Sequence, residues 1–180
     1  MGGGARRPAV MASIFTGVPF RLGLAAAVTV AAVDQAVKAW LLWGFELGGR
    51  GQVAVAPLVD LVLAWNTGIS YGMFQESGPL GQALLLAFKL AAVVVLSVWL
   101  MRTRSRLTGA ALGLIIGGAV GNMVDRALYG AVVDFVLLHA TVGGRTFYWY
   151  VFNLADAAIV AGVAGLIYES LFMPGAAKAP

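Results

Sequence analysis

Two aspartates in apolar surroundings are the residues of this sequence best suited to chemistry. Asp134 lies in GAVVDFV and Asp156 in FNLAD, and neither has a cation next to it in the sequence. Two carboxyl groups in one dry site cannot both ionise cheaply, so such a pair holds one proton and titrates as a unit. One carboxylate can then activate a water molecule while the other carboxyl protonates a carbonyl oxygen. The predicted chemistry is amide hydrolysis without serine, cysteine or metal.

Both aspartates also have plainer interpretations. Asp156 stands where a helix is expected to begin, and an aspartate there ordinarily caps the helix. Asn153, three residues earlier, is an equally good cap candidate. From spacing alone, hydrolysis, proton or ion coupling and a purely structural role all stay open for Asp134 and Asp156.

Other polar residues stand at helical spacing. Asp34 and Lys38 are four residues apart, close enough to pair on one helix face, and we interpret this pair as structural. Asn122, Asp125 and Arg126 also share a face, with Arg126 expected to hold Asp125 ionised in a structural or binding role. Four acidic residues are expected to be peripheral, namely Glu46, Asp60, Glu76 and Glu169.

The composition indicates that lipid is the solvent for most of the chain. Hydrophobic residues make up 61% of the 180 residues and charged residues only 11%, whereas soluble domains carry about 25% charged residues. The absence of cysteine excludes disulfides and thiolate chemistry, and the single histidine, His139, cannot form a metal cluster alone. No stripe of aromatic and basic residues supports nucleic-acid binding.

Four segments are long and apolar enough to cross a bilayer, which takes about 20 residues each. They run from about 22–43, 80–101, 107–124 and 156–173, within a single membrane domain of residues 1–180. The first 33 residues could also suggest a signal peptide. A retained helix fits better, because the apolar pattern continues to Trp43 without a convincing cleavage site.

Arginine placement predicts the orientation of these spans. Arg6, Arg7 and Arg21 precede the first span, and Arg102, Arg104 and Arg106 fill the turn between the second and third. The positive-inside rule therefore places residues 1–21 and this turn in the cytoplasm. Two outer loops follow, at about 44–79 and 126–155.

The outer loops contain strand-like segments rich in β-branched and aromatic residues, at residues 52–55, 59–65, 131–136 and 146–152. Within the third span, glycines at positions 109, 113, 117 and 121 form a smooth stripe. Such a stripe lets a neighbouring helix approach closely.

Lys89 lies inside the second span without a partner at helical spacing. Its ammonium group either extends to the interface or meets a carboxylate on another helix. The sequence leaves both interpretations open.

Four blocks of the sequence resemble, in order, the lipoprotein signal peptidase (signal peptidase II) family of bacterial intramembrane aspartyl proteases. They are DQAVK from Asp34 to Lys38, NTGISYGMF from Asn66 to Phe74, GGAVGNMVDRALYGAVVDF from Gly117 to Phe135, and FNLADAAI from Phe152 to Ile159. The stretch from Ile69 to Met73 departs from the family pattern, and so does the length of the segment from Leu137 to Tyr148. Whether that segment forms a lid hinged at Gly143 and Gly144 is left open.

The resemblance implies an all-α membrane core of four transmembrane helices with a small extracytoplasmic β-cradle, formed largely by the first outer loop, and an interfacial loop. It implies a monomer in the bacterial inner membrane that cleaves lipid-modified prolipoproteins just before the diacylglyceryl cysteine, among membrane lipids, with no cofactor or metal. It also implies inhibition by globomycin. Asp134 and Asp156 match the catalytic pair, on the extracytoplasmic side. The residues implied to line and brace the site are Asn66, Gly121, Asn122, Asp125, Arg126 and Asn153.

Two other classes of protein compete with this interpretation. A small transporter or proton-coupled channel would explain charges within the spans, but its charges are expected near the bilayer midplane. Asp134 and Asp156 are expected at one edge. A non-catalytic assembly protein would explain the glycine stripe but not the grouped asparagines and aspartates.

Overall fold

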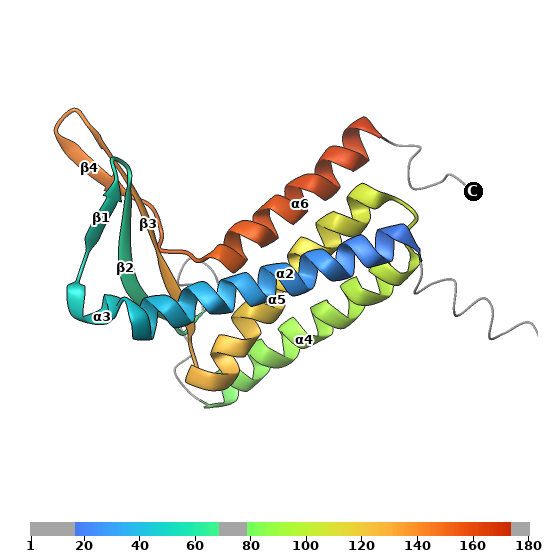
Figure 1. Cartoon of the computed structure of the whole chain (residues 1–180), viewed down its shortest axis with the longest axis horizontal. Helices are drawn as coiled ribbons and strands as arrows, with labels where there is room; N and C mark the ends of the chain where they lie inside the picture. The colour runs from blue at the N-terminus through green and yellow to red at the C-terminus, as the bar shows by residue number, and fades with distance from the viewer. Residues whose placement is uncertain (1–16, 69–78, 174–180) are drawn as a thin grey trace, which may run out of the picture.

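Long helices dominate the computed structural model, which describes residues 17–68 and 79–173 (Figure 1). The helices are α2 (Val18–Ala39), extended by the π-helical turn η1 (Trp40–Gly44), then α4 (Pro79–Arg102), α5 (Arg106–Tyr129) and α6 (Leu154–Phe172). Arg6, Arg7, Glu76 and the stretch from Ile69 to Met73 lie outside the described residues, and so do the expectations placed on them.

Three of the described helices are long and apolar enough to cross a membrane. They are the continuous helix Val18–Gly44, the helix Arg106–Tyr129 and the helix Leu154–Phe172. α4 has 24 residues and occupies the place of the expected second span. α5 continues to Tyr129, five residues beyond the expected end of the third span, and therefore carries Asp125 and Arg126 in its last turns.

A four-stranded antiparallel sheet lies at one end of the helices, in the order β1-β2-β3-β4 (Figure 1). β1 (Val53–Ala56) and β2 (Val59–Asn66) follow the short helix α3 (Leu47–Arg50), whereas β3 (Val132–Val142) and β4 (Arg145–Tyr148) follow α5. The strands expected in both outer loops are therefore present. The resemblance implies a sheet formed largely by the first loop, whereas within the described residues the two outer loops contribute two strands each.

The segment from residue 137 to 148 is a hairpin. Gly143 and Gly144 have φ values of 59° and 78°, which suit the two-residue turn that matches the twist of paired strands. Val142 pairs with Arg145 directly before this turn. The two glycines, considered above as a lid hinge, thus form the tip of a paired ribbon.

The glycine stripe of α5 packs directly on the backbone of α2. A Cβ added at Gly117 would lie 2.5 Å from the carbonyl oxygen of Ala27, and one at Gly113 would lie 2.8 Å from the Cα of Gly23. The predicted close approach of a neighbouring helix is confirmed. On another face of α5, Gly118 contacts Ala155 of α6 in the same way, so α5 is packed tightly between two helices.

Two small apolar clusters complete the core. One joins α2, α4 and α5 through Ala27, Leu100, Leu112 and Ile116. The other lies where η1 and α3 meet the sheet and contains Leu41, Leu47 and Phe135. The second cluster fixes β3 against the end of the first span.

Two acidic residues expected to be peripheral are buried. Asp60 lies in the sheet, 3.1 Å from His139 Nε2. Glu169 is 5% exposed and accepts a hydrogen bond from Thr108, which joins α6 to the start of α5. Both are partnered by residues distant in sequence, which spacing could not reveal.

The close approach predicts that Gly113→Ala destabilises the protein. The new methyl group must push α2 away, which we expect to cost about 1–3 kcal/mol. Thermal unfolding in detergent, followed by tryptophan fluorescence, measures the change in Tm. Gly49→Ala is the matched control, because a Cβ there meets nothing within 4 Å. Equal Tm values for the two variants would contradict the close packing.

Candidate active site

Lys38 joins two buried carboxylates from different helices. Its Nζ lies 2.7 Å from Asp34 Oδ2 and 2.7 Å from Asp125 Oδ2, and it donates a further hydrogen bond to Asn122 Oδ1 at 3.2 Å. The three charged side chains are at most 2% exposed. The predicted Asp34–Lys38 pair is present, but its cation also serves Asp125.

Asp125 is held by residues that sequence reasoning did not assign to it. Besides the adjacent Arg126, the cation expected for it, Asp125 forms an ion pair with Lys38. Gln35 Nε2 donates to Asp125 Oδ1 at 2.7 Å and to the carbonyl oxygen of Gly121 at 3.0 Å. Gln35 stands between Asp34 and Lys38 in the sequence, but a neutral amide gave no charge signal that would single it out.

Gly121 lies against this group because it has no side chain. A Cβ added there would approach Asp34 Oδ2 to 2.7 Å. The other oxygen of Asp34 accepts from the backbone N–H of Ala155 at 3.0 Å, at the start of α6. Asp34 thus ties the first turn of α6 to α2, and Gly121 leaves room for it to do so.

Arg126 braces the end of β2. It donates a hydrogen bond to the carbonyl oxygen of Gly68, and the N–H of Gly68 donates to Asn66 Oδ1 at 3.1 Å. The guanidinium group is buried. It therefore fixes the turn that orients the Asn66 amide.

Asp134 is brought to the site by the pairing of β3 with both of its neighbours. In the β2–β3 register Ala64 faces Asp134, after an irregularity between Leu61 and Ala64, so Asn66 reaches Asp134 diagonally along the same face. Its Nδ2 donates to Asp134 Oδ2 at 3.0 Å. On the other side, Val136 pairs with Phe152, which places Asn153 beside Asp134.

Two asparagines stand between the two aspartates. Asn153 Nδ2 donates to Asp134 Oδ1 at 2.6 Å and to Asn122 Oδ1 at 3.0 Å. Asn122 Nδ2 donates to Asp156 Oδ1 at 2.8 Å. Because each amide is itself held by neighbours, both carboxylates are fixed in orientation, as a preorganised site requires.

Asp156 serves as a helix cap and as a member of this cluster. Asn153 is the N-cap of α6: its Oδ1 accepts from the N–H of Asp156 at 2.9 Å, while Asp156 Oδ2 accepts from the N–H of Asn153 at 3.2 Å. This reciprocal capping box holds one carboxylate oxygen at the helix terminus. The other oxygen, Oδ1, is turned to Asn122.

The two aspartates differ in their surroundings. Asp134 is 2% exposed, whereas Asp156 is half-buried. Burial raises the pKa of Asp134 from 3.8 to about 6, and the nearby charge of Asp156 adds to the shift against the hydrogen bonds from Asn66 and Asn153. The buried carboxyl thus holds a proton more readily than a free aspartate does. Within the described residues no three His, Cys, Asp or Glu side chains are placed to hold a metal ion.

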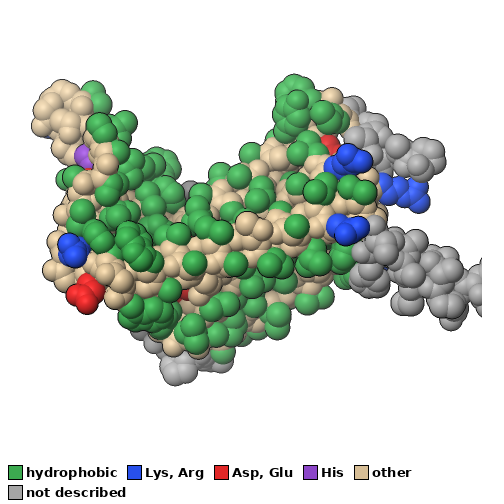
Figure 2. All heavy atoms as spheres, viewed as in Figure 1, with side chains coloured by type: hydrophobic (Ala, Val, Ile, Leu, Met, Phe, Trp, Pro, Cys, Tyr) green, Lys and Arg blue, Asp and Glu red, His purple; other side chains and the backbone are tan. Residues whose placement is uncertain are grey.

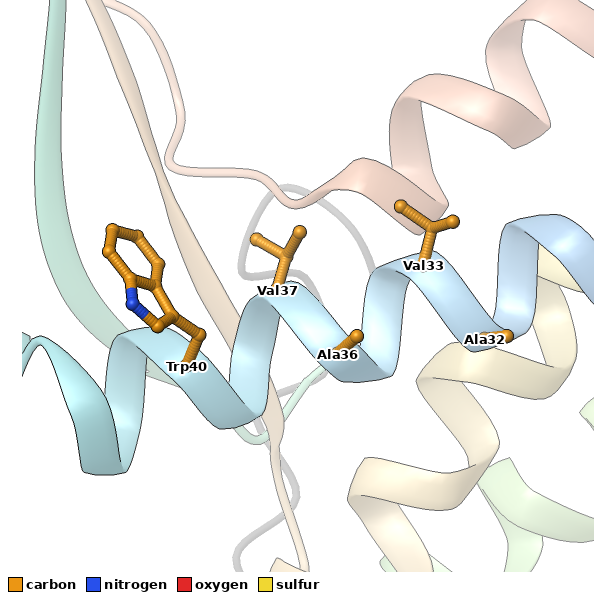
Figure 3. A pocket seen from close by; sticks show the side chains of 5 residues that line it. All are labelled: Ala32, Val33, Ala36, Val37 and Trp40. Atoms are coloured by element: carbon orange, nitrogen blue, oxygen red, sulfur yellow. The ribbon is translucent and has the colours of Figure 1, made fainter.

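An apolar groove lies beside this cluster on α2. Ala32, Val33, Ala36, Val37 and Trp40 line it, and its volume is about 480 Å³. Figure 3 shows Val33 and Val37 pointing toward the segment that enters α6. Figure 2 shows the molecule hollowed between the sheet and α6, with hydrophobic side chains along much of the surface.

The fold and the site define a helical membrane protein with grouped carboxylates at one end of its spans. Residues 26–172 match the family model described as Signal peptidase (SPase) II. The chain belongs to the signal peptidase II family, as the four sequence blocks predicted. Membership implies that it is a protease, and together with the three apolar helices it indicates a multi-pass protein of the inner membrane.

Similar proteins cover nearly the whole chain. It is 59% identical over 162 residues to a lipoprotein signal peptidase of Rhodopseudomonas palustris, spanning 90% of this chain and 99% of that protein. A lipoprotein signal peptidase of Methylorubrum extorquens is 57% identical over 152 residues, 84% of this chain and 86% of the relative. Two solved structures of a bacterial membrane enzyme share the fold.

The first of these structures has a TM-score of 0.69 at 24% identity. The match covers 83% of this chain and 87% of the chain in that structure. The second has a TM-score of 0.68 at 25% identity and covers 84% of this chain and 93% of its own. Both likenesses cover more than four fifths of this chain, so the overall fold is shared.

The raised pKa of Asp134 predicts a pH-dependent stability. The folded protein keeps this proton where the unfolded chain has lost it, so the associated stability is complete below pH 3.8 and is lost as the pH rises through about 6. The loss amounts to at most about 3 kcal/mol. The Tm difference between Asp134→Asn and wild type should therefore grow in favour of the variant between pH 4 and 7.

Glu46→Gln is the control for this measurement, since Glu46 is an exposed carboxyl group. Its Tm difference from wild type should stay constant over the same pH range. A constant difference for Asp134→Asn as well would show that Asp134 titrates like a solvated carboxyl group.

Proposed function

We propose that this chain is an aspartyl endopeptidase that removes the signal peptide from diacylglyceryl-modified prolipoproteins, cutting just before the lipidated cysteine. The observation that carries the proposal is the Asn122–Asn153 pair, whose amides hold Asp134 and Asp156 in fixed orientations. Its relatives in Rhodopseudomonas palustris and Methylorubrum extorquens are lipoprotein signal peptidases. The catalytic type follows from the two carboxylates.

The surroundings of the two aspartates suggest how the work is divided. Asp134, which is buried and has a raised pKa, holds the shared proton. Asp156 is more exposed and acts on water as a carboxylate base. Water attacks the scissile carbonyl carbon while its proton passes to Asp156 and the proton of Asp134 passes to the carbonyl oxygen. The product of this step is a neutral tetrahedral diol.

Collapse of the diol reverses the two roles. Asp156 gives its proton to the amide nitrogen, the C–N bond breaks, and Asp134 recovers a proton from a diol hydroxyl group. The signal peptide leaves with a new carboxyl group, and the lipidated cysteine becomes the new N-terminus. The pair returns to one proton, so the cycle needs no cofactor.

The apolar groove on α2 suits the hydrophobic part of such a substrate. Val33, Val37 and Trp40 line it, and Val33 and Val37 directly precede Asp34 and Lys38, which anchor the catalytic cluster. We place an acyl chain or the signal helix there, entering sideways from the bilayer. Recognition would then depend on lipid and shape more than on sequence, and a single chain with its surrounding lipids would suffice.

The orientation of the chain follows from its cations. The turn between α4 and α5 carries Arg102, Arg104 and Arg106, all exposed, at the end of the helices opposite the sheet (Figure 1). We count α4 as a membrane span beside the other three helices. The positive-inside rule then puts the turn between α4 and α5 in the cytoplasm. The sheet and the two aspartates then lie on the extracytoplasmic side, where water reaches them.

The proposed activity predicts that Asp134→Asn and Asp156→Asn abolish cleavage. Purified protein in detergent is incubated with a lipidated preprolipoprotein, and mass spectrometry identifies the new N-terminal cysteine. Loss of acid–base catalysis should reduce the rate by about 10²–10⁴-fold, and globomycin should inhibit the wild type.

Asp60→Asn is the matched control, because Asp60 lies on the same sheet but pairs with His139. It should keep most of the wild-type rate. Near wild-type cleavage by either dyad variant would refute the dyad, and a wild type that cleaves nothing would refute the protease.

The proposed orientation is tested by labelling single cysteines, which is straightforward because the chain has none. Thr146→Cys, near the exposed hairpin tip, should react with a membrane-impermeant maleimide in intact spheroplasts. Arg104→Cys, in the turn between α4 and α5, should react only after permeabilisation. The opposite pattern would invert the topology.

A further inference from the structure

The side-chain amide of Gln35 lies between two groups of α5 that lead to the two aspartates. Its Nε2 donates to Asp125 Oδ1 at 2.7 Å and to the carbonyl oxygen of Gly121 at 3.0 Å. An amide nitrogen carries two hydrogens, so both of them are used on α5. Gln35 itself belongs to α2 and is half-buried. The proposed reaction gives this residue no role.

The first of these hydrogen bonds leads to Asp134. Asp125 is 1% exposed, and within residues 17–68 and 79–173 Gln35 is the one donor to its Oδ1. Its Oδ2 accepts from Lys38 at 2.7 Å and from the backbone N–H of Val133 at 3.0 Å. Because a carboxyl group turns as a unit, the hydrogen bond at Oδ1 also aims Oδ2. Val133 directly precedes Asp134, so the amide of Gln35 helps to place the strand that carries Asp134.

The second hydrogen bond leads to Asp156. The carbonyl group of Gly121 belongs to the peptide group that joins it to Asn122, and the amide of Gln35 holds this peptide group. The side chain of Asn122 in turn donates to Asp156 Oδ1 at 2.8 Å. One side chain of α2 therefore acts toward both aspartates, through two positions of α5 that are one helical turn apart.

Glutamine is the residue type that suits this position. Two acceptors must be met by one terminal atom, which requires an NH2 or an ammonium group. A lysine would add a second ammonium group beside Lys38, a carboxylate has no donor, and asparagine is one methylene shorter. The ionisable groups that face the amide are Asp34, at 3.5 Å, and Asp125, with Lys38 between them. A neutral amide supplies both donors without adding a charge to this group.

The attachment of α2 to α5 does not depend on Gln35. Gly113 and Gly117 already place the backbone of α5 directly against that of α2. Lys38 joins the same two helices through its ion pairs with Asp34 and Asp125. The two hydrogen bonds of Gln35 therefore contribute more to the orientation of the site than to the stability of the helix pair.

We propose that Gln35 is a positioning residue that sets the relative placement of Asp134 and Asp156. It acts through Asp125 and through the Gly121–Asn122 peptide group, and it forms no hydrogen bond with either aspartate of the pair. The inference rests on the proposed function, because this placement matters to catalysis only if the two aspartates form the catalytic pair.

The test is Gln35→Met in the full-length protein in detergent. Methionine keeps an unbranched side chain of similar length and removes both donors. The kcat for cleavage of a lipidated preprolipoprotein should fall by about 10–100-fold, because small displacements of reacting groups have effects of that size. KM should stay within about twofold, since the lost interaction is not with the substrate. Rates are measured well below the Tm of each variant, so that all of the protein is folded, and the Tm itself should change little.

Hydrogen–deuterium exchange shows whether the effect passes through Asp125. In Gln35→Met the carboxyl group of Asp125 is free to turn, so the backbone N–H of Val133 should exchange faster than in the wild type. Mass spectrometry of peptides that cover residues 131–136 measures this. Peptides that cover β1 should be unchanged, because that strand has no contact with Asp125 in the sheet order. A lower kcat without faster exchange at Val133 would overturn the proposal.

Gln52→Met is the matched control. Gln52 Nε2 also donates to a buried aspartate, Asp60, but this pair lies in the sheet beside His139. Removal of this amide should leave kcat at the wild-type value. An equal loss of kcat in Gln52→Met would contradict a specific role for Gln35.

Gln35→Asn covers the case in which Gln35→Met does not fold. It keeps a polar amide but withdraws it by one methylene from both acceptors, so the same loss of kcat at unchanged KM is expected. Wild-type kcat in the variant that folds overturns the proposal. A rise in KM that accounts for the lower rate overturns it as well.

Failure of the proposed function has a different appearance. In that case Asp134→Asn or Asp156→Asn retains cleavage, and the dyad itself is wrong. If both variants are inactive and Gln35→Met cleaves like the wild type, the dyad stands and only the role of Gln35 falls.

Discussion

The contact on which the rest of the structure depends is the Lys38 ammonium between Asp34 and Asp125. Its two ion pairs of 2.7 Å join α2 to α5 inside the protein, where either carboxylate alone would be very costly to bury. Each of the two aspartates also fixes a further element of the fold. Asp34 accepts the N–H of Ala155 and fixes α6, while Asp125 accepts the N–H of Val133 and fixes β3. The two elements that carry Asp156 and Asp134 are therefore both held by carboxylates that Lys38 neutralises.

The four aspartates thus form two pairs, one that supports the fold and one that is proposed to carry out the reaction. The two carboxylates that share Lys38 each accept its ammonium group and further N–H donors, so their oxygens are occupied by structural contacts. Asp134 accepts from the amides of Asn66 and Asn153, and Asp156 from the amide of Asn122 and the backbone N–H of Asn153. Amide donors orient a carboxyl group without fixing its charge. The same type of side chain thus serves two purposes, according to whether its neighbour is an ammonium group or an amide.

Much of the fold could be predicted from local patterns. Apolar length located the helices to within a few residues, the four-residue spacing predicted the Asp34–Lys38 pair, and the glycine spacing predicted a close helix approach. The sequence could not predict which polar side chains pair with residues of another helix or strand. Asp125 pairs with Lys38, 87 residues away, and Arg126 donates a hydrogen bond to Gly68, 58 residues away. The irregularity in β2 that lets Asn66 reach Asp134 depends on pairing with β3, so no local signal marks it.

The capping box at the start of α6 has a mechanical consequence. Asp156 Oδ2 accepts the N–H of Asn153, and a carboxylate is a stronger acceptor than a neutral carboxyl group. In the proposed reaction Asp156 carries a proton only while the diol exists, so the first turn of α6 is held less firmly during that interval. Asn153 belongs to that turn and also orients Asp134. The helix terminus would therefore loosen and tighten once per turnover, in step with the formation and departure of the product.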